Sequence, residues 1–234
     1  MQLWLCPLIA FLLGSIPFGL LIARLKGINI REHGSGNIGA TNVLRTIGKK
    51  YGITCLILDA LKGFIPTVVA ISLIRFEGMN NPISIPALEP WAGEFPMLTA
   101  QISQVVTGLC AVLGHNFSPW VGFRGGKGIA TSAGVLIALM PAAIAILIVI
   151  WLLLFLASRY VSLASIGAAA ALPLLTLWGS WFHGKIQDGT WNKPLFVFSL
   201  IIAVLAIWKH RSNIRRIREG TEHRFSRKAK SADA

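Results

Sequence analysis

Seven apolar stretches divide the chain, and together they suggest a bundle of helices in a lipid bilayer. Most approach the length needed to cross about 30 Å of hydrocarbon, and isolated strands cannot cross lipid, so we predict a helix for each. The seven stretches lie at 3–23, 52–74, 99–114, 129–140, 143–158, 163–181 and 195–209. Pro141 separates the fourth from the fifth, which fits either a tight hairpin of two helices or a kink in one long tilted helix.

The charges between these stretches favour an odd number of crossings. Cytoplasmic loops of membrane proteins carry an excess of Lys and Arg. With seven crossings, segment 24–51 and the tail 209–234 share one side, and they hold six and nine basic residues. Segments 75–98 and 182–194, on the other side, have no such excess. We therefore predict an all-α polytopic membrane bundle with the N-terminus outside and the C-terminus in the cytoplasm.

The composition agrees with a membrane protein. Of the 234 residues, 54% are hydrophobic and 13% are charged, against roughly a quarter charged in soluble domains. The length predicts one domain over 1–234, with 220–234 as a frayed basic tail. The net charge of +13 needs no nucleic acid, because the basic residues flank apolar segments, where membrane topology and anionic lipid account for them.

The first apolar stretch and the cysteines have simple interpretations. No basic segment precedes the first stretch, and Arg24 and Lys26 follow it, so we expect a retained helix and not a cleaved signal peptide. Cys6, Cys55 and Cys110 all lie in apolar stretches and show no metal-ligand spacing. We expect them to be packing residues.

Four polar patches fall in or beside the predicted cytoplasmic segments, and the other side has none of similar character. They read GSGNIGATN (34–42), GHNFSPWVGFRGGKG (114–128), SRYVSLAS (158–165) and HRSNIRRIREGTEHRF (210–225). Glycine, serine, asparagine, histidine and arginine dominate them. We therefore expect any chemistry at the cytoplasmic face.

The segment RGGKG, residues 124–128, has the properties of a phosphate site. Adjacent glycines can turn backbone N–H groups toward a ligand. A helix predicted to begin at Ile129 would add unpaired N–H donors and the positive end of its dipole. Arg124 and Lys127 supply full charges. The segment is not a Walker A loop, because Gly128 stands where Ser or Thr is needed, and a plain helix N-terminus with cations at the headgroups is the alternative.

The GSGNIGATN segment offers similar chemistry. Ser35, Asn37, Thr41 and Asn42 are short donors and acceptors on a flexible backbone, and Arg45 follows one helical turn after Thr41. Such a loop can hold an oxyanion or a polyol. The alternative is a capped turn at the membrane surface, since Ser and Asn commonly cap helices.

The histidines are candidates for acid–base chemistry, and several enzyme classes are disfavoured. His115 begins the HNFSP turn and His210 begins the last polar patch, and an asparagine follows one residue later (Asn116) and three residues later (Asn213). No cluster has metal-ligand spacing, so a catalytic zinc is not expected. The sequence contains no G-x-S-x-G elbow. At His115, the residue at His-x4-Asp acyltransferase spacing is Trp120 and not an aspartate. Ser162 and Ser165 are expected to pack or cap a helix, and Arg215 and Glu219 to pair on an exposed helical face.

Taken together, the four patches resemble the bacterial acyl-phosphate:glycerol-3-phosphate acyltransferases of the inner membrane. The matching stretches, in the family's order, are GSGNIGATN with a following Arg, GHNFSPWVGFRGGKGIAT, SLAS and HRSNIRRIREGTE. Family members more often have Lys at the position of Arg124, a change that keeps the charge. The outer loop around 80–95 has no counterpart that we can match.

The resemblance implies a seven-helix enzyme that moves an acyl group from acyl-phosphate to glycerol-3-phosphate. The products are 1-acyl-glycerol-3-phosphate (lysophosphatidic acid) and phosphate, the first committed acylation of phospholipid synthesis. It implies no metal or organic cofactor and no acyl-CoA or acyl-carrier protein as direct donor. A soluble phosphate acyltransferase would supply the donor, and a membrane acyltransferase would consume the product.

Residue roles follow from the resemblance together with the residue chemistry. Ser35, His115, Lys127 and His210 are the catalytic candidates. The substrate-binding candidates are Gly36, Asn37, Thr41, Asn42, Arg45, Asn116, Arg124, Gly125, Gly126, Gly128, Ser162, Asn213 and Glu222. One Gly-rich loop would hold each phosphate, and the sequence does not assign which. The proton acceptor is either the donor phosphate or one of the two histidines.

Two other classes compete with an enzyme. An organic-phosphate transporter would also place basic Gly-rich loops at helix ends, but coupled transporters usually have ionisable groups at mid-membrane. Asp59 is the only acid within a predicted span, near its cytoplasmic third. A lipid-binding scaffold would have no use for four chemistry-bearing patches on one face.

Overall fold

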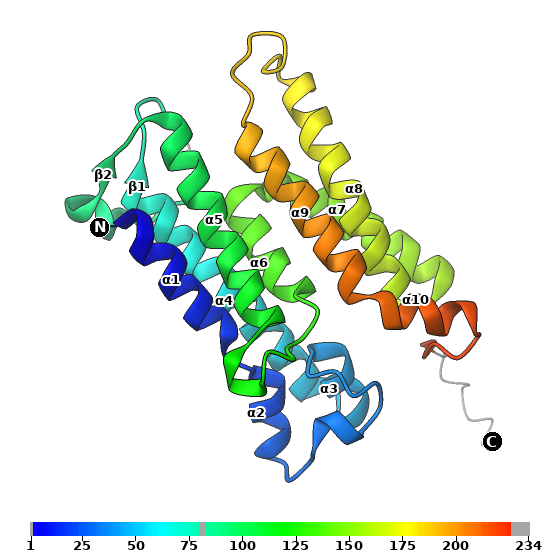
Figure 1. The fold of residues 1–234 in the computed structure, drawn as a ribbon. Helices are drawn as coiled ribbons and strands as arrows, with labels where there is room; N and C mark the ends of the chain where they lie inside the picture. The colour runs from blue at the N-terminus through cyan, green and yellow to red at the C-terminus, as the bar shows by residue number, and fades with distance from the viewer. Residues whose placement is uncertain (1, 80–82, 226–234) are drawn as a thin grey trace, which may run out of the picture.

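The computed structural model describes residues 2–79 and 83–225, and these are almost entirely helical (Figure 1). The helices are α1 (Gln2–Ser15), α2 (Phe18–Arg24), α3 (Ala40–Thr46), α4 (Lys49–Leu73), α5 (Met97–Asn116), α6 (Ile129–Leu139), α7 (Pro141–Ser158), α8 (Val161–Phe182), α9 (Lys193–Lys209) and α10 (Arg211–Arg218). Short 3₁₀ turns form at η1 (Ile30–Glu32), η2 (Pro86–Trp91) and η3 (Pro119–Val121). Two short parallel strands, β1 (Ile74–Arg75) and β2 (Gly93–Glu94), pair Ile74 with Gly93.

All seven predicted stretches are helical, with ends that differ by at most three residues from the sequence estimate. The first is broken into α1 and α2 at Ile16 and Pro17. Proline has no N–H to donate and its ring disfavours a continuous helix. The chain resumes as α2 with Pro17 as its N-cap.

The run around Pro141 is a hairpin of two helices. Gly128, before α6, and Ser162, at the start of α8, line the same cavity, and α6 and α7 connect them, so α7 must return toward the level at which α6 begins. Pro141 stands at the first turn of α7, where its missing N–H costs nothing. Of the two interpretations that the sequence left open, the hairpin is correct.

Helix lengths do not confirm seven crossings. Five segments of the described chain are long and apolar enough to cross: α1 with α2, α4, α5 extended to Val121, α7 and α8. The α9–α10 pair, bent by 51°, is a possible sixth. Helix α6, at about 16 Å, is shorter than the hydrocarbon core. The seven crossings and the orientation of the termini therefore stay predictions.

The helices form two groups that meet along the centre of the molecule. In one group α1 packs on α5 and α4 on α6, and in the other α8 packs between α7 and α9, while α5 contacts α9 (Figure 1). Glycines allow the closest approaches: a Cβ on Gly134 would lie 1.9 Å from the carbonyl oxygen of Ala60. Val112, Val135, Leu172 and Ile202 join four helices in the main apolar cluster.

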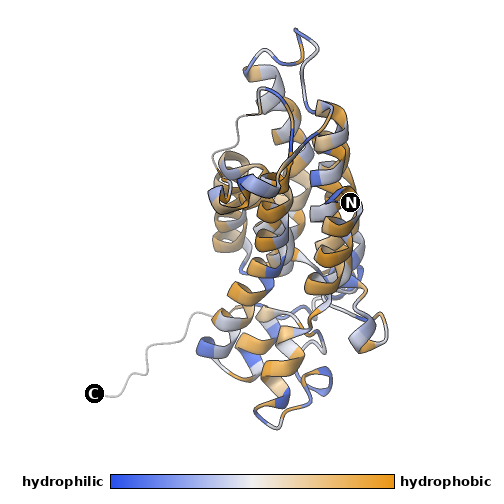
Figure 2. Cartoon of the chain, turned by 90° about the vertical axis from the view of Figure 1, so that its left-hand side faces the viewer, coloured by the Kyte–Doolittle hydropathy of each residue, from blue (hydrophilic) through white to orange (hydrophobic). Residues whose placement is uncertain are grey.

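The outer surface of the bundle is apolar, as expected for a lipid-facing protein. Helix α7 has a single buried residue, Leu147, while Leu152, Leu153 and Leu156 are exposed. A helix that is apolar all round and still exposed needs a non-aqueous environment. Figure 2 shows these apolar helices in orange, with the polar residues concentrated in the connecting segments.

Candidate functional site

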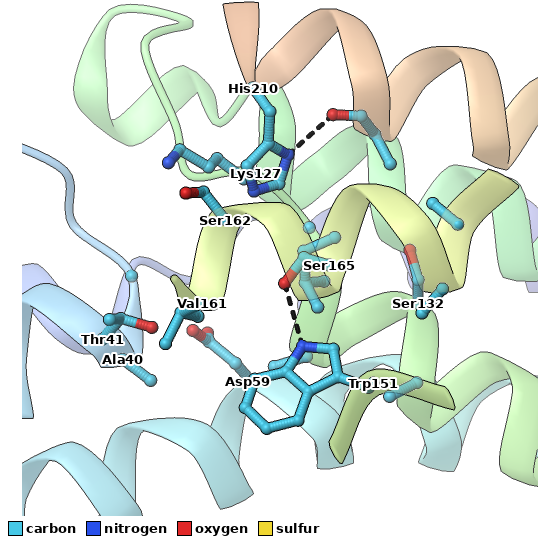
Figure 3. A pocket seen from close by; sticks show the side chains of 18 of the residues that line it. Ala40, Thr41, Asp59, Lys127, Ser132, Trp151, Val161, Ser162, Ser165 and His210 are labelled. Carbon is cyan, nitrogen blue, oxygen red and sulfur yellow. Dashed lines mark hydrogen bonds between the residues drawn. The ribbon is translucent and has the colours of Figure 1, made fainter. Parts of the chain in front are cut away.

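One cavity of about 400 Å³ collects residues from all four polar patches. Ser35, Lys127 and His210, which are distant in sequence, all line it. The predicted site residues in its wall are Ser35, Asn37, Thr41, Asn42, Arg45, His115, Lys127, Gly128, Ser162, His210, Asn213 and Glu222. Figure 3 shows Lys127, Ser162 and His210 close together, on three different elements. The expectation that the patches converge is therefore confirmed.

A hydrogen-bonded network centred on Glu222 forms the polar end of the cavity. Its Oε1 accepts hydrogen bonds from Ser162 Oγ (2.7 Å) and Asn213 Nδ2 (2.6 Å). Its Oε2 accepts from Arg216 Nε at 2.7 Å. Lys127 Nζ donates to Asn213 Oδ1. Residues from α8, α10 and the loop before α6 are thus fixed relative to one another.

The network controls two charges. Burial raises the pKa of the Glu222 carboxyl, but hydrogen bonds from Asn213, Ser162 and Arg216 outweigh burial and hold the pKa below its usual value. Burial, with the nearby cations Arg216 and Arg45, lowers the pKa of Lys127 to about 8, although Glu222 opposes this. Lys127 is therefore a cation whose charge an arriving anion would stabilise.

The RGGKG loop is formed against the end of α5, and α6 begins at Ile129 as predicted. A Cβ on Gly126 would lie 2.1 Å from His115 Nε2, and one on Gly125 would lie 2.0 Å from the carbonyl oxygen of His115. Gly128 has φ +80°, a conformation that favours glycine. Close packing thus requires the two adjacent glycines, which the sequence analysis had explained by ligand contact.

Five predicted binding residues do not line the cavity. Gly125 and Gly126 face inward from the RGGKG loop and pack on His115. Arg124 is exposed, and its carbonyl oxygen accepts a hydrogen bond from Arg31 Nη2 at 2.8 Å. These five are Gly36, Asn116, Arg124, Gly125 and Gly126. Asn116 is fully buried against Gly128, and Lys209 Nζ donates to its carbonyl oxygen at 2.8 Å. Gly36, at φ +68°, serves a turn.

Asn42 organises the GSGNIGATN loop. Its side chain is 2% exposed, donates to the carbonyl oxygens of Ile30, His33 and Asn37, and accepts from the N–H of Ser35. Its hydrogen-bonding capacity is therefore used within the loop, and a direct substrate contact through this amide is disfavoured. Ser35 and Thr41 remain at the cavity wall with hydroxyls for which the described residues show no hydrogen bond.

Up to Phe225, the C-terminal segment that we expected to fray from residue 220 packs against the site. Gly220, at φ +69°, turns the chain back after α10. Arg45 Nη2 donates to the carbonyl oxygen of His223 at 3.2 Å, and its guanidinium lies 4.8 Å from the ring centre of Phe225. The rest of the predicted tail, residues 226–234, lies outside the residues that the structure describes.

The histidines occupy different positions. His210 is 3% exposed, and its Nδ1 lies 2.7 Å from the carbonyl oxygen of Ala206 (Figure 3), so a neutral ring presents Nε2 as an acceptor. His115 is buried under the RGGKG loop and reaches the cavity wall. The predicted pair of Arg215 and Glu219 is present at 2.8 Å on an exposed face.

The serines of α8 do not cap that helix. Ser162 bonds to Glu222, and Ser165 Oγ accepts from Trp151 Nε1 at 3.1 Å (Figure 3). Trp151 had no role in the sequence analysis. Nothing in its sequence context distinguishes it from a lipid-facing tryptophan.

Asp59 was noted in the sequence but given no part in the site. It lines the cavity, and its side chain is 3% exposed and paired with Lys62. The signal was available, since ionisable residues inside a membrane span are commonly functional. The sequence analysis used it only to weigh transport against catalysis.

The other end of the cavity is apolar. Its wall includes Leu136, Ile144, Leu147, Leu172 and Ile202. From Ser162 to Leu172 the wall follows α8 for about 15 Å, at roughly 1.5 Å per residue. One cavity therefore joins a cationic, hydrogen-bonding end to an apolar end inside the bundle.

Comparison with known proteins identifies the family. The model of the glycerol-3-phosphate acyltransferase family matches residues 4–220. Glycerol-3-phosphate acyltransferases of Geobacter sulfurreducens and Aquifex aeolicus are 42% and 41% identical, with 93% and 92% of this chain and 94% and 95% of theirs aligned.

Solved structures agree. A crystal structure of PlsY (YgiH), an integral membrane glycerol 3-phosphate acyltransferase, in its glycerol 3-phosphate form matches with a TM-score of 0.78 at 37% identity, covering 97% of this chain and 96% of that one. The lysophosphatidic acid form matches with a TM-score of 0.74. Since the family model spans nearly the whole chain and the relatives align over almost their full length, this chain belongs to the glycerol-3-phosphate acyltransferase family of integral membrane enzymes.

Proposed function

We propose that the protein transfers a fatty acyl group from acyl-phosphate to glycerol-3-phosphate. The products are 1-acyl-glycerol-3-phosphate and phosphate, so the reaction would begin phospholipid synthesis. The observation that carries this proposal is the joining of a cationic end and an apolar end in one cavity. The cationic end suits phosphate, and the apolar end suits an acyl chain, each buried methylene of which is worth about 0.8 kcal/mol.

Two anion positions are available for the two phosphates. Lys127 with Gly128 and the start of α6 forms one, where a charged side chain and free N–H groups coincide. Arg45 and the hydroxyls of Ser35 and Thr41 form the other.

Acyl transfer from acyl-phosphate requires little from the protein beyond positioning of the two substrates. The hydroxyl oxygen of glycerol-3-phosphate forms a bond to the acyl carbon, and the bond from that carbon to the phosphate oxygen breaks. The mixed anhydride is already activated, so alignment and stabilisation of the developing oxyanion supply most of the required effect. The hydroxyl proton passes either to the departing phosphate or to Nε2 of a histidine. His115→Ala and His210→Ala together separate the two, because near-normal turnover at saturating substrate in each variant excludes both histidines as the base.

The membrane setting supports an inward-facing site. We infer a bacterial inner-membrane location with seven passes, the short α6 among them, the N-terminus outside and the C-terminus in the cytoplasm. The basic segments 24–51 and 209–225 both contribute residues to the polar end of the cavity. An excess of basic residues is what the cytoplasmic side of a membrane protein carries. The donor would come from a soluble phosphate acyltransferase, and a second membrane acyltransferase would take the product.

The test is a reconstituted assay with purified protein, acyl-phosphate and labelled glycerol-3-phosphate. We expect labelled lysophosphatidic acid with acyl-phosphate and none with acyl-CoA as the control donor. Lys127→Ala should abolish the reaction in a protein that still folds. Product formation from acyl-CoA at equal rate would refute the donor assignment, and proteoliposome uptake without any donor would favour transport.

A further inference from the structure

A charged cluster lies buried beneath the RGGKG loop. Lys62 Nζ lies 2.8 Å from Asp59 Oδ1, and both side chains are 3% exposed. Lys62 Nζ also donates to the carbonyl oxygen of Ile16 at 2.7 Å. A buried ion pair contributes little to stability, because desolvation offsets the attraction, so its presence calls for another explanation.

His115 connects this ion pair to the phosphate loop. Its Nδ1 lies 3.6 Å from Asp59 Oδ1, just beyond hydrogen-bonding distance. The opposite ring nitrogen, Nε2, faces Gly126, where a Cβ would lie only 2.1 Å away. The N–H of Gly126 donates to the carbonyl oxygen of His115 at 3.1 Å. The imidazole is therefore enclosed between the carboxylate and the loop, and a rotation of the ring would displace Gly126.

The buried nitrogen of His115 lacks a hydrogen bond. No atom in the described part of the chain accepts from or donates to Nδ1, although it is shielded from solvent. Asp59 Oδ1 is the charged acceptor beside it. Buried polar atoms normally find partners, and polar contacts in unliganded sites often shorten when a ligand arrives.

We propose that Asp59, neutralised by Lys62, is a positioning residue for the phosphate loop and acts through His115. When the cavity is occupied, its carboxylate accepts a hydrogen bond from Nδ1–H of His115, and this fixes the ring with Nε2 directed at the RGGKG backbone. The loop beside Lys127 is then held in its phosphate-binding shape. This inference rests on the proposed acyl transfer, because it assigns the loop a substrate phosphate.

A purely structural ion pair is the competing interpretation. Lys62 ties α4 to the break between α1 and α2 through Ile16, which is a packing role. Replacing a buried ion pair with apolar residues of similar volume is commonly neutral or stabilising. The structural interpretation therefore predicts that an apolar pair restores activity, whereas the positioning interpretation predicts that it does not.

The experiment uses Asp59→Asn and the double variant Asp59→Leu/Lys62→Met in the full-length, membrane-purified protein. We expect the double variant to unfold at the wild-type temperature and still to lose at least tenfold in kcat/KM. The loss should fall mainly on the KM of the phosphate substrate that Lys127 holds, which the pH dependence of the two KM values identifies. In a His115→Ala background, Asp59→Asn should change kcat/KM by less than twofold, since coupled residues do not act additively.

Three results would overturn the proposal. They are wild-type kcat/KM in the double variant, an equal loss from Asp59→Asn with and without His115, and a loss confined to folding yield. The cycle with Asp59→Asn decides the question even if the double variant does not fold. Failure of the wild-type protein to use acyl-phosphate at all would be a separate result, which removes the proposed function itself.

Discussion

The charge of Lys127 provides the sharpest test of the phosphate site, through pH. Burial lowers the pKa of Lys127 from 10.5 to about 8, which corresponds to a cost of roughly 3 kcal/mol for keeping the empty site charged. A bound phosphate dianion compensates that cost. The ammonium fraction is about one half at pH 8 and approaches a tenfold fall per pH unit above it, so binding should weaken about fifteenfold between pH 8 and 9.5.

The assay compares wild type with Lys127→Arg from pH 7 to 9.5. Phosphate groups are already dianionic at the lower limit, since their second pKa is about 6, and an arginine stays charged throughout. We expect the KM of one phosphate-bearing substrate to rise in the wild type and to stay level in the variant. That substrate is the one that Lys127 holds, so the measurement also assigns the two anion positions. Acyl-phosphate decay without enzyme, measured at each pH, is the control.

The same pKa gives the sign of a stability effect. The folded pKa lies below the unfolded value, so the unfolded chain binds more protons between about pH 8 and 10.5, and stability rises with pH across that window. At pH 7 the charged Lys127 is therefore a net cost. Lys127→Met should lose activity without a lower unfolding temperature. An alkaline limb shared by wild type and Lys127→Arg, or a clear fall in unfolding temperature for Lys127→Met, would refute the reasoning.

Further predictions follow from contacts at the site. Gly126→Ala should reduce kcat/KM at least a hundredfold, because its Cβ would meet His115, whereas Gly179→Ala, with nothing within 4 Å, should be neutral in the same assay. Glu222→Gln should cost tenfold or more in kcat/KM, and a neutral result would remove the network from the mechanism. The matched exposed carboxylate, in Glu219→Gln, should change activity less than twofold. Ala168→Leu, in the cavity wall, should lower kcat/KM for long acyl chains by about fourfold per displaced methylene, measured over a donor series.

The helices could be predicted from the sequence because the bilayer leaves few alternatives. An apolar stretch must satisfy its own backbone hydrogen bonds, so its length and type follow from composition. The break at Pro17 was less visible, since proline near a helix end is compatible with either a continuous or a broken segment. The number of crossings depends on whether α6 extends across the whole bilayer, and hydropathy alone does not determine this.

The contributions of individual side chains were harder to predict. Asn42 and Gly126 were expected to face a ligand. Instead, Asn42 forms hydrogen bonds within its own loop, and Gly126 packs against the His115 ring, where a side chain would not fit. Small polar residues and glycines are favoured both where a ligand binds and where backbones pack closely. The same residue types therefore occur at ligand-binding positions and at closely packed positions, and only the three-dimensional packing distinguishes the two. Trp151 shows the opposite case, a residue in the site that the sequence did not indicate. Its hydrogen bond to Ser165 depends on how α7 and α8 face each other.

The convergence of the polar patches was nevertheless predictable, and the reason is geometric. In a soluble protein, loops can lie anywhere on a closed surface, so polar segments that are far apart in sequence need not meet. A membrane confines connecting segments to two planes, and the charge bias assigns each segment to one of them. Once Ser35, Lys127 and His210 fall on the same face of a bundle this small, a shared cavity needs only an opening between helices. The apolar walls of α6, α8 and α9 provide that opening, so a polar reaction centre and a buried acyl chain can share one site.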